Sequence, residues 1–203
     1  MPRDKSLTHA KVLDAAKRIF LEKGYEQASI REIAAAAGIT SAGLYRHCSD
    51  KEDLFEQVVE PAIKALQEWV TQHIRQSYER MENREYQGIG SQSEIEMIRK
   101  VALPYREEFR LLLLKSGGTK HEHFLQDMVE THETKMWEGL RNIAAYGYQV
   151  KEVSREELHI LISAYITALF EPIIRDYPEE KVEHYLDTVE AFFMPGWHEL
   201  LGV

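Results

Sequence analysis

The sequence predicts an all-α fold of about nine helices. Apolar residues recur along the whole chain at a helical period near 3.6, and no stretch shows a convincing strand pattern. Capping residues, glycines and prolines divide this pattern into separate helices. With 203 residues, of which 44% are hydrophobic and 29% charged, the chain has the composition of a folded protein with one large or two small domains.

The first two predicted helices follow each other closely in the sequence. The first covers residues 7–23 and stops at Gly24 and Tyr25; its inward residues are Val12, Ala16, Ile19 and Phe20. Ser29 can cap the second, whose inward side is formed by Ile30, Ile33, Ala34 and Ala37. Gly38 then ends that helix, because glycine adopts a positive φ at no steric cost.

A third short helix is predicted to follow this turn. Thr40 or Ser41 can cap it, Ile39 can fill the corner, and Leu44 is its one large inward anchor. With Leu44 turned inward, the outward residues are Ser41, Ala42, Tyr45 and Arg46. Small residues beside two longer polar ones suit a helix that enters a DNA groove, so this stretch predicts a DNA-reading helix-turn-helix.

The same residues resemble the N-terminal domain of TetR-family transcriptional regulators. That family typically shows a Thr or Ser before helix 2, an IA-x-x-AG-[VI] turn, a recognition helix ending in LYRHF or LYxYF, and a K-x-x-L start to the next helix. The matching positions are Ser29, Ile33–Ala34, Ala37–Gly38–Ile39, Leu44–Tyr45–Arg46–His47 and Lys51–Glu52–Asp53–Leu54. Two positions depart from the pattern: Cys48 stands where a phenylalanine is usual, and Gly43 lies inside the recognition helix.

The resemblance implies a regulator that binds a pseudo-palindromic, double-stranded DNA operator and represses by occlusion, although an activator could use the same residues. Ser29, Tyr45 and Lys51 are expected to contact phosphates, and Thr40, Ser41, Ala42, Arg46 and His47 to lie near base edges. The DNA-binding residues predicted in full are Ser29, Arg31, Thr40, Ser41, Ala42, Gly43, Tyr45, Arg46, His47 and Lys51.

The charge distribution agrees with DNA binding at one end of the chain. The formal net charge is −9, which alone would argue against a nucleic-acid partner. Residues 1–51, however, contain nine Lys and Arg against six Asp and Glu, whereas residues 52–203 contain sixteen against twenty-eight. Positive potential is therefore confined to the N-terminal quarter, where phosphate would be attracted.

The rest of the chain predicts a larger helical domain, so the domains are expected at residues 1–49 and 50–203. Asp50 can cap a long helix toward Met81, with a kink at Pro61. After a loop at EYQGIGSQS, the further helices are expected over residues 92–103, 104–115 and 119–146, from a capping box at Ser154 to 175, and from Pro178 to 201. The third of these would end at Gly147.

The last two helices predict a homodimer interface. They are apolar around more of their circumference than one core face requires, so they could pack inward and still meet a twin across a two-fold axis. The alternative is that both are simply the core of a monomer. The interface residues predicted are Leu158, Ile162, Tyr165, Ile166, Leu169, Val182, Tyr185, Val189, Phe193 and Trp197.

A small-molecule pocket is implied by the resemblance alone, because regulators of this family hold an effector within helices 4 to 7. Aromatic character selects its candidate residues, for each of which an ordinary core role is the alternative: Trp69, Tyr105, Phe109, Phe124, Met128, Trp137 and Tyr165. No metal site is expected from His121, His123 and His132, since on one helix the first two would point apart and the third would lie too far along the axis.

Several other classes are excluded by the sequence. No G-x-S-x-G, H-E-x-x-H or phosphate-loop motif occurs, so we expect neither an enzyme nor a cofactor. The apolar stretch from Leu158 to Phe170 is too short to span a bilayer and no secretory signal is seen, which predicts a cytoplasmic protein without a membrane partner. Two alternatives remain: a helical protein-interaction adaptor, or a ligand-independent regulator with a solid core.

Overall fold

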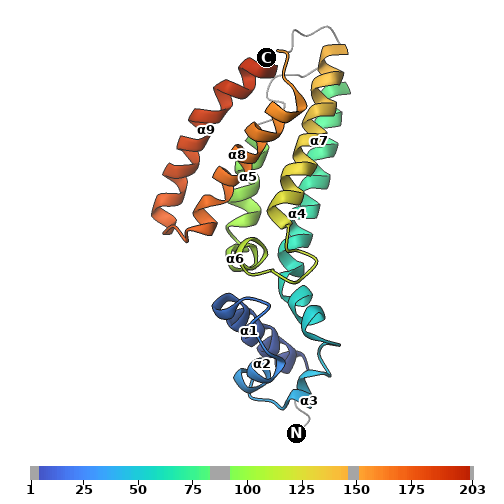
Figure 1. Cartoon of the computed structure of the whole chain (residues 1–203), viewed down its shortest axis with the longest axis vertical. Coiled ribbons are helices and arrows are strands. Elements are labelled where there is room, and N and C mark those ends of the chain that lie inside the picture. Colours follow the sequence, from blue (N-terminus) through green and yellow to red (C-terminus); the bar gives the residue numbers. More distant parts are fainter. Residues whose placement is uncertain (1–4, 83–91, 146–150, 202–203) are drawn as a thin grey trace. The chain divides into compact units, whose positions relative to one another are not determined.

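The protein is all-helical throughout the part of the chain that the structure describes. The computed structural model describes residues 5–82, 92–145 and 151–201. Within these ranges lie nine α-helices and one π-helical turn: α1 (Lys5–Lys23), α2 (Ile30–Ala36), α3 (Ser41–Leu44), α4 (Lys51–Glu82), α5 (Gln92–Met97), η1 (Ile98–Ala102), α6 (Arg106–Leu114), α7 (Phe124–Ala145), α8 (Arg155–Ile174) and α9 (Glu179–Leu201) (Figure 1). The predicted fold class is confirmed.

The helices gather into two compact units. Unit 1 comprises Met1–Leu66 and Tyr105–Glu122, and unit 2 comprises Gln67–Pro104 and His123–Val203. The first half of α4 and all of α6 therefore cluster with α1–α3 rather than with the later helices. These units describe packing and do not test which segment binds DNA, so the functional boundary between residues 49 and 50 stays a prediction.

Unit 1 is built on one apolar core. Helix α1 packs against α2 and α6, and α2 packs against α3. Three aromatic rings meet in this core, with ring centroids 5.2 Å apart for Phe20 and Phe55 and 5.5 Å apart for Tyr25 and Phe55. The fully buried side chains that surround them include Val12, Ala16, Ile33, Leu44, Leu54 and Phe109. Burial of this apolar surface fixes how the three N-terminal helices pack together.

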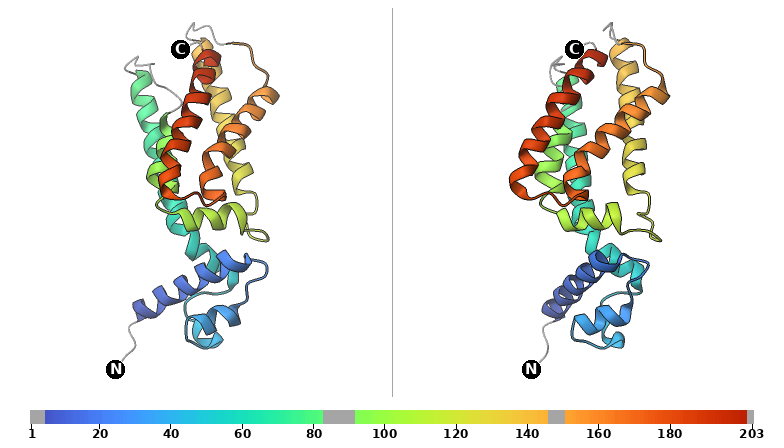
Figure 2. Two further views of the ribbon diagram at one scale, coloured as in Figure 1. Left: turned by 90° about the vertical axis from the view of Figure 1, so that its left-hand side faces the viewer. Right: turned by 60° about the vertical axis from the view of Figure 1, so that its left-hand side comes forward.

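In unit 2, α8 lies between α7 and α9. It contacts both helices, and the right-hand view of Figure 2 shows it running obliquely from α7 toward α9. The predicted capping box starts α8: the amide of Glu157 donates to Ser154 Oγ at 3.2 Å, and the Ser154 amide donates to Glu157 Oε2 at 2.8 Å. The buried residues of α8 are Leu158, Ile162, Tyr165, Ile166, Leu169, Phe170, Pro172 and Ile173.

Helix α8 spans the residues that the sequence predicted, from the capping box at Ser154 to within one residue of Arg175. The apolar stretch was expected to be too short for a membrane span, but the helix runs through Pro172 to Ile174 and has 20 residues. By length and composition it could cross a membrane. Eight of its side chains are buried within the protein. Packing in the core therefore accounts for the apolar character of this helix.

Two predicted helix starts lie too early. Helix α7 begins at Phe124 rather than Thr119, because the Thr119 hydroxyl donates to Ser116 O at 2.7 Å and closes a turn before the helix. Helix α6 begins at Arg106 rather than Pro104, with Tyr105 at its N-cap. The expected loop EYQGIGSQS lies largely outside the described residues, as does the predicted helix end at Gly147.

Helix α4 runs through Pro61 as a single element of 32 residues. The Asp53 amide donates to Asp50 Oδ1 at 2.8 Å, which confirms the predicted cap. Pro61 is exposed and has no N–H to donate to the Gln57 carbonyl one turn earlier. The kink expected at Pro61 stays a prediction.

Candidate nucleic-acid interface

The turn between α2 and α3 has the predicted local geometry. Ser29 Oγ accepts a hydrogen bond from the Glu32 amide at 3.3 Å, and the Ser29 amide donates to Glu32 Oε2 at 3.2 Å, which forms a capping box. Gly38 has a φ of 70°, a value that favours glycine. The Gly43 amide then donates to Thr40 Oγ1 at 3.0 Å, so Thr40 caps α3.

Helix α3 presents its predicted face to solvent. Leu44 is fully buried, whereas Tyr45 is 54% exposed and Ala42 and Arg46 are exposed. Arg46 forms no ion pair or side-chain hydrogen bond with any described residue, and the same holds for Arg31. The two guanidinium groups are available for phosphate or base edges, each with donors in a planar fork.

Gly43 has a structural reason to be glycine. A Cβ at this position would lie 3.3 Å from Thr40 Oγ1, the atom that caps the helix, and 3.7 Å from Ile39 Cβ. Any larger residue would therefore press on the capping hydroxyl. A close approach of this backbone to DNA stays a prediction, and it is not needed to explain the glycine.

Lys51 is held by the protein itself. Its Nζ donates to the carbonyl oxygens of Tyr25 at 2.8 Å, Ala28 at 3.1 Å and Glu26 at 3.3 Å, and lies 4.3 Å from the centroid of the Tyr25 ring. An ammonium group has three hydrogens to donate, and these three contacts use them. A phosphate contact by Lys51 would have to replace one of them.

Ser29 is also engaged within the chain, since its hydroxyl contacts Glu32 Oε2 at 2.9 Å. Lys23 forms an ion pair with the same carboxylate. Hydrogen bonds from Lys23 and Ser29 hold the pKa of Glu32 below its usual value. Ser29 is exposed, so its predicted phosphate contact remains geometrically open.

His47 and Cys48 connect α3 to the rest of unit 1. The His47 ring stacks on the His9 ring of α1 with centroids 5.5 Å apart, and the His47 carbonyl accepts a hydrogen bond from Gln57 Nε2 at 3.1 Å. Cys48 is buried, and burial together with Asp53 and Asp50 raises the pKa of its thiol to about 11. Little thiolate forms at neutral pH, which favours the interpretation of Cys48 as a small core residue.

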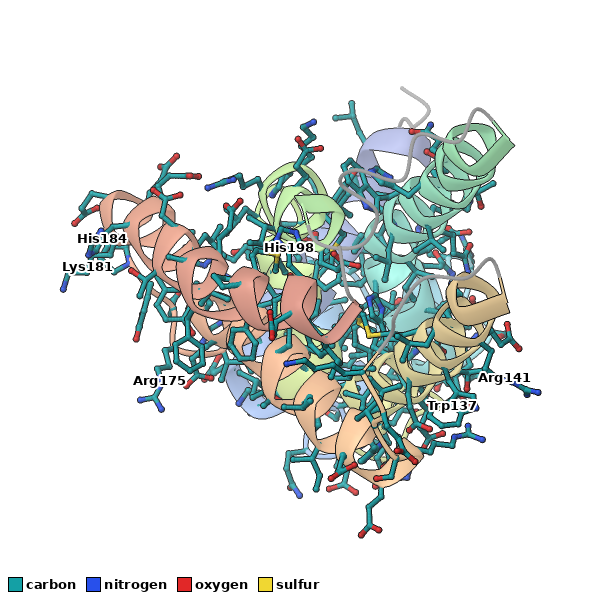
Figure 3. The ribbon with its side chains drawn as sticks, turned by 90° about the horizontal axis from the view of Figure 1, so that it is seen from above. Trp137, Arg141, Arg175, Lys181, His184 and His198 are labelled. Atoms are coloured by element: carbon teal, nitrogen blue, oxygen red, sulfur yellow. The ribbon has the colours of Figure 1, made fainter. Side chains whose placement is uncertain are left out.

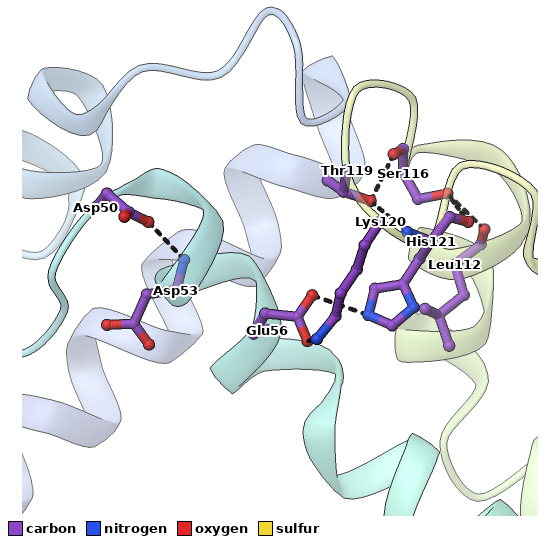
Figure 4. A network of polar contacts seen from close by, with 8 residues as sticks. All are labelled: Asp50, Asp53, Glu56, Leu112, Ser116, Thr119, Lys120 and His121. Atoms are coloured by element: carbon purple, nitrogen blue, oxygen red, sulfur yellow. Dashed lines mark hydrogen bonds and ion pairs between the residues drawn. The ribbon is translucent and has the colours of Figure 1, made fainter.

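A polar network joins the first turns of α4 to the segment before α7. Glu56 Oε1 lies 2.8 Å from His121 Nε2, and Glu56 Oε2 lies 2.8 Å from Lys120 Nζ (Figure 4). The Ser116 hydroxyl is bonded to the carbonyls of Leu112 at 2.7 Å and His121 at 3.0 Å. The expectation of no metal site assumed that His121, His123 and His132 lie on one helix. That assumption was wrong, because His121 and His123 precede α7.

The predicted ligand-binding residues are divided between the units. Tyr105 and Phe109 belong to unit 1, and the other five belong to unit 2. Phe109 and Tyr165 are buried, whereas Tyr105, Trp69, Phe124, Met128 and Trp137 are half-buried. Within unit 2, Trp137 and Arg141 of α7 lie at the edge opposite Lys181 and His184 of α9 (Figure 3). A single pocket lined by all seven stays a prediction.

The predicted dimer residues are mostly buried within the chain itself, and their part in an interface stays a prediction. Tyr185 and Phe193 are half-buried, and the eight others are buried in unit 2: Leu158, Ile162, Tyr165, Ile166, Leu169, Val182, Val189 and Trp197. Their side chains are covered by other residues of the same chain, which is also what the alternative of a plain core predicts. The large apolar residues that α8 and α9 do expose are Ile160, Leu161 and Phe192.

These features define an all-helical protein with an N-terminal helix-turn-helix whose second helix is exposed on its polar side. Residues 12–58 match the family described as bacterial regulatory proteins, tetR family. This stretch of the chain is therefore similar to the N-terminal part of TetR-family regulators.

Two curated relatives match over a short stretch of the chain. Over 53 residues the chain is 43% identical to the HTH-type transcriptional regulator AcrR of Shigella flexneri, covering 26% of this chain and 25% of that protein. Over 52 residues it is 40% identical to the HTH-type transcriptional repressor BepR of Brucella suis, with coverage of 26% and 25%. These alignments span about a quarter of each relative's length.

Similarity over the whole chain is lower and concerns the fold. The structural alignment with a TetR-family regulator from Streptomyces coelicolor covers 95% of this chain and 90% of that protein. Its TM-score is 0.60 and the sequence identity is 18%. The chain also resembles MexZ, a repressor of Pseudomonas aeruginosa, at a TM-score of 0.56 and 17% identity, with coverage of 97% and 96%. The chain thus shares the fold of these two proteins over nearly its whole length.

Proposed function

We propose that this protein is a cytoplasmic, ligand-responsive repressor that binds a pseudo-palindromic DNA operator as a homodimer and leaves it when a small molecule binds. The observation that carries DNA binding is α3, which is anchored by buried Leu44 and is followed directly by exposed Tyr45 and Arg46. Repression follows the relatives named as repressors. One relative, FasR of Mycolicibacterium smegmatis, is named an activator and is 35% identical over 75 residues.

On the operator, α3 would lie in the major groove with Arg46 near base edges and Tyr45 near a phosphate. Arg31 and the caps Ser29 and Thr40 would add contacts at the ends of α2 and α3. Positive charge in the N-terminal quarter would attract the phosphate backbone and orient the protein. Small-molecule release requires that the ligand binds the DNA-incompetent form more tightly; a hundredfold preference corresponds to about 2.7 kcal/mol.

Replacement of Arg46 by alanine tests the proposed contact between the α3 region and DNA bases. Sequences bound by the purified protein would first be selected from random DNA, and affinity for the selected site measured by fluorescence anisotropy. We expect Arg46→Ala to weaken binding at least tenfold and relax the preference at one position per half-site, because a bidentate base contact contributes about 1–3 kcal/mol. Arg18→Ala, at an exposed position of α1, is the matched control. Equal affinities for the Arg46 variant and the wild type would refute the assignment of α3.

A second copy of the chain would pack on the exposed apolar residues of α8 and α9. Phe192 is 77% exposed, an unusual state for so large an apolar side chain, and Ile160 and Leu161 of α8 are exposed as well. A two-fold dimer places the two α3 helices on successive turns of one DNA face. The interface residues proposed here replace the buried set inferred from periodicity.

We expect Phe192→Glu to shift the protein from dimer to monomer at micromolar concentration in sedimentation-velocity measurements, because it places a charge in an apolar interface. Leu114→Glu, at an exposed leucine of α6, should leave the sedimentation coefficient unchanged. A dimer that persists in the Phe192 variant with unaltered dissociation would show that this surface is not the interface.

A further inference from the structure

The segment that follows α3 is tied to α4 within unit 1. Gln57 Nε2 donates to the His47 carbonyl at 3.1 Å and to Asp53 Oδ1 at 3.0 Å. These two bonds use both hydrogens of the amide nitrogen. The Ser49 amide in turn donates to Asp53 Oδ2 at 2.7 Å. The backbone position of His47 is therefore set by the first turns of α4.

The side chain of His47 is held by a different helix. Its ring stacks on the His9 ring of α1, with centroids 5.5 Å apart and ring planes inclined by 26°. Aromatic rings at this separation attract each other in an offset-stacked arrangement. Both histidines are half-buried, so the stack is partly accessible from outside unit 1. The stack restricts rotation of the His47 ring, because a side chain that turned away would lose this contact.

The stack leaves the ring nitrogens of both histidines unused. No hydrogen bond or ion pair joins a ring nitrogen of His9 or His47 to another residue within 5–82, 92–145 and 151–201. An imidazole always offers at least one N–H donor, and its neutral form offers one acceptor as well. His47 comes directly after Tyr45 and Arg46, the proposed DNA contacts. Its nitrogens are therefore available to DNA while its ring face is in contact with His9.

We propose that His9 is a positioning residue for DNA binding: its ring holds the His47 side chain in the orientation that contacts DNA, and His9 itself makes no DNA contact. A mobile side chain loses rotational freedom when it binds, and this loss weakens affinity. A ring that is already stacked in the free protein has lost much of that freedom beforehand. The inference rests on the proposed DNA-binding function and adds to it a residue of α1, outside the α2–α3 turn.

Operator affinities of single variants test the ring contact. The duplex selected from random DNA is titrated with the full-length protein and followed by fluorescence anisotropy. We expect His9→Ala to weaken binding about three- to tenfold, because the His47 side chain must then be ordered when DNA binds. His9→Phe keeps a flat ring but removes both nitrogens, and its affinity should stay within about twofold of the wild type. His123→Ala, the same change at an exposed histidine of unit 2, should have no effect.

A double-mutant cycle separates positioning from a direct contact and from a folding defect. In the His47→Ala background, His9→Ala should change operator affinity by less than about twofold, since the side chain that His9 positions is absent. The cycle is measured at a salt concentration at which the His47 variant still binds. A direct bond from His9 to DNA, or unfolding caused by the loss of His9, would instead lower the affinity in both backgrounds.

Three results would overturn the proposal: wild-type affinity in His9→Ala, a loss in His9→Phe as large as that in His9→Ala, or an equal effect of His9→Ala with and without His47. In each case the wild type still binds its operator, so the DNA-binding function stands and only the role of His9 fails. If the wild type selects no sequence from random DNA, the DNA-binding function fails and the role of His9 fails with it.

Discussion

Leu44→Ala should lower the free energy of unfolding of unit 1 by about 3 kcal/mol and abolish specific operator binding. Leu44 is fully buried and is the one buried residue of α3, so its side chain alone anchors this four-residue helix in the core. The alanine would remove most of that apolar contact and leave a cavity. Because α3 is too short to be stable by itself, its exposed residues would lose their fixed geometry.

Urea denaturation monitored by circular dichroism and fluorescence anisotropy with labelled operator would measure the two effects separately. Leu7→Ala is the matched control, since it makes the same chemical change at a leucine of α1 that is 61% exposed. Surface substitutions usually change stability by less than about 0.5 kcal/mol. A Leu44 variant with the stability of the wild type would mean that α3 is held by contacts other than this anchor.

The helix-turn-helix could be predicted almost residue by residue because its signals are local. Ser29 and Thr40 cap helices through atoms three residues away, and Gly38 adopts its positive φ within the turn itself. Leu44 is the only large apolar residue in a short polar stretch, so its inward direction follows from the sequence alone. These determinants operate over a few residues and need no knowledge of the remaining fold.

Helices α8 and α9 could be predicted as helices but not as surfaces. An apolar pattern that extends nearly all round α8 has no clear phase, and the side that faces α7 and α9 cannot be told from the side that faces solvent. The sequence therefore assigned Leu158 and Ile162 to an interface, whereas both are buried in their own unit. Exposure of Phe192 becomes visible only when the neighbouring helices are in place.

Contacts between distant residues were the least predictable part. Lys51 meets carbonyls of residues 25–28, and Glu94 meets His132 on another helix. No local pattern marks either pair, because such contacts depend on how the helices pack. Glu94 Oε2 and Trp197 Nε1 are buried without a hydrogen-bond partner among the described residues, which likewise cannot be read from a local pattern.

Lys51→Met should destabilise unit 1 by about 2 kcal/mol while leaving the salt dependence of operator binding unchanged. Methionine keeps much of the apolar stem but removes the ammonium that bonds to the carbonyls of Tyr25, Glu26 and Ala28. Hydrogen bonds from a charged donor contribute about 1.5–3 kcal/mol each when buried, and the partial exposure of these carbonyls allows water to replace some of that. We therefore infer that Lys51 fixes the segment leading into α2 and in this way positions the helix-turn-helix for DNA binding.

A direct phosphate ligand would behave differently. Loss of a phosphate contact lowers the slope of log K against log salt by about 0.9 for each contact, and its effect on the stability of the free protein is small. Thermal unfolding and anisotropy titrations across a range of salt concentrations distinguish the two roles. Lys11→Met, at an exposed position of α1, controls for the loss of one positive charge in the same unit. A flattened salt slope with unchanged stability in the Lys51 variant would restore the phosphate contact and exclude the positioning role, because an ammonium bound to DNA cannot keep all three carbonyl contacts.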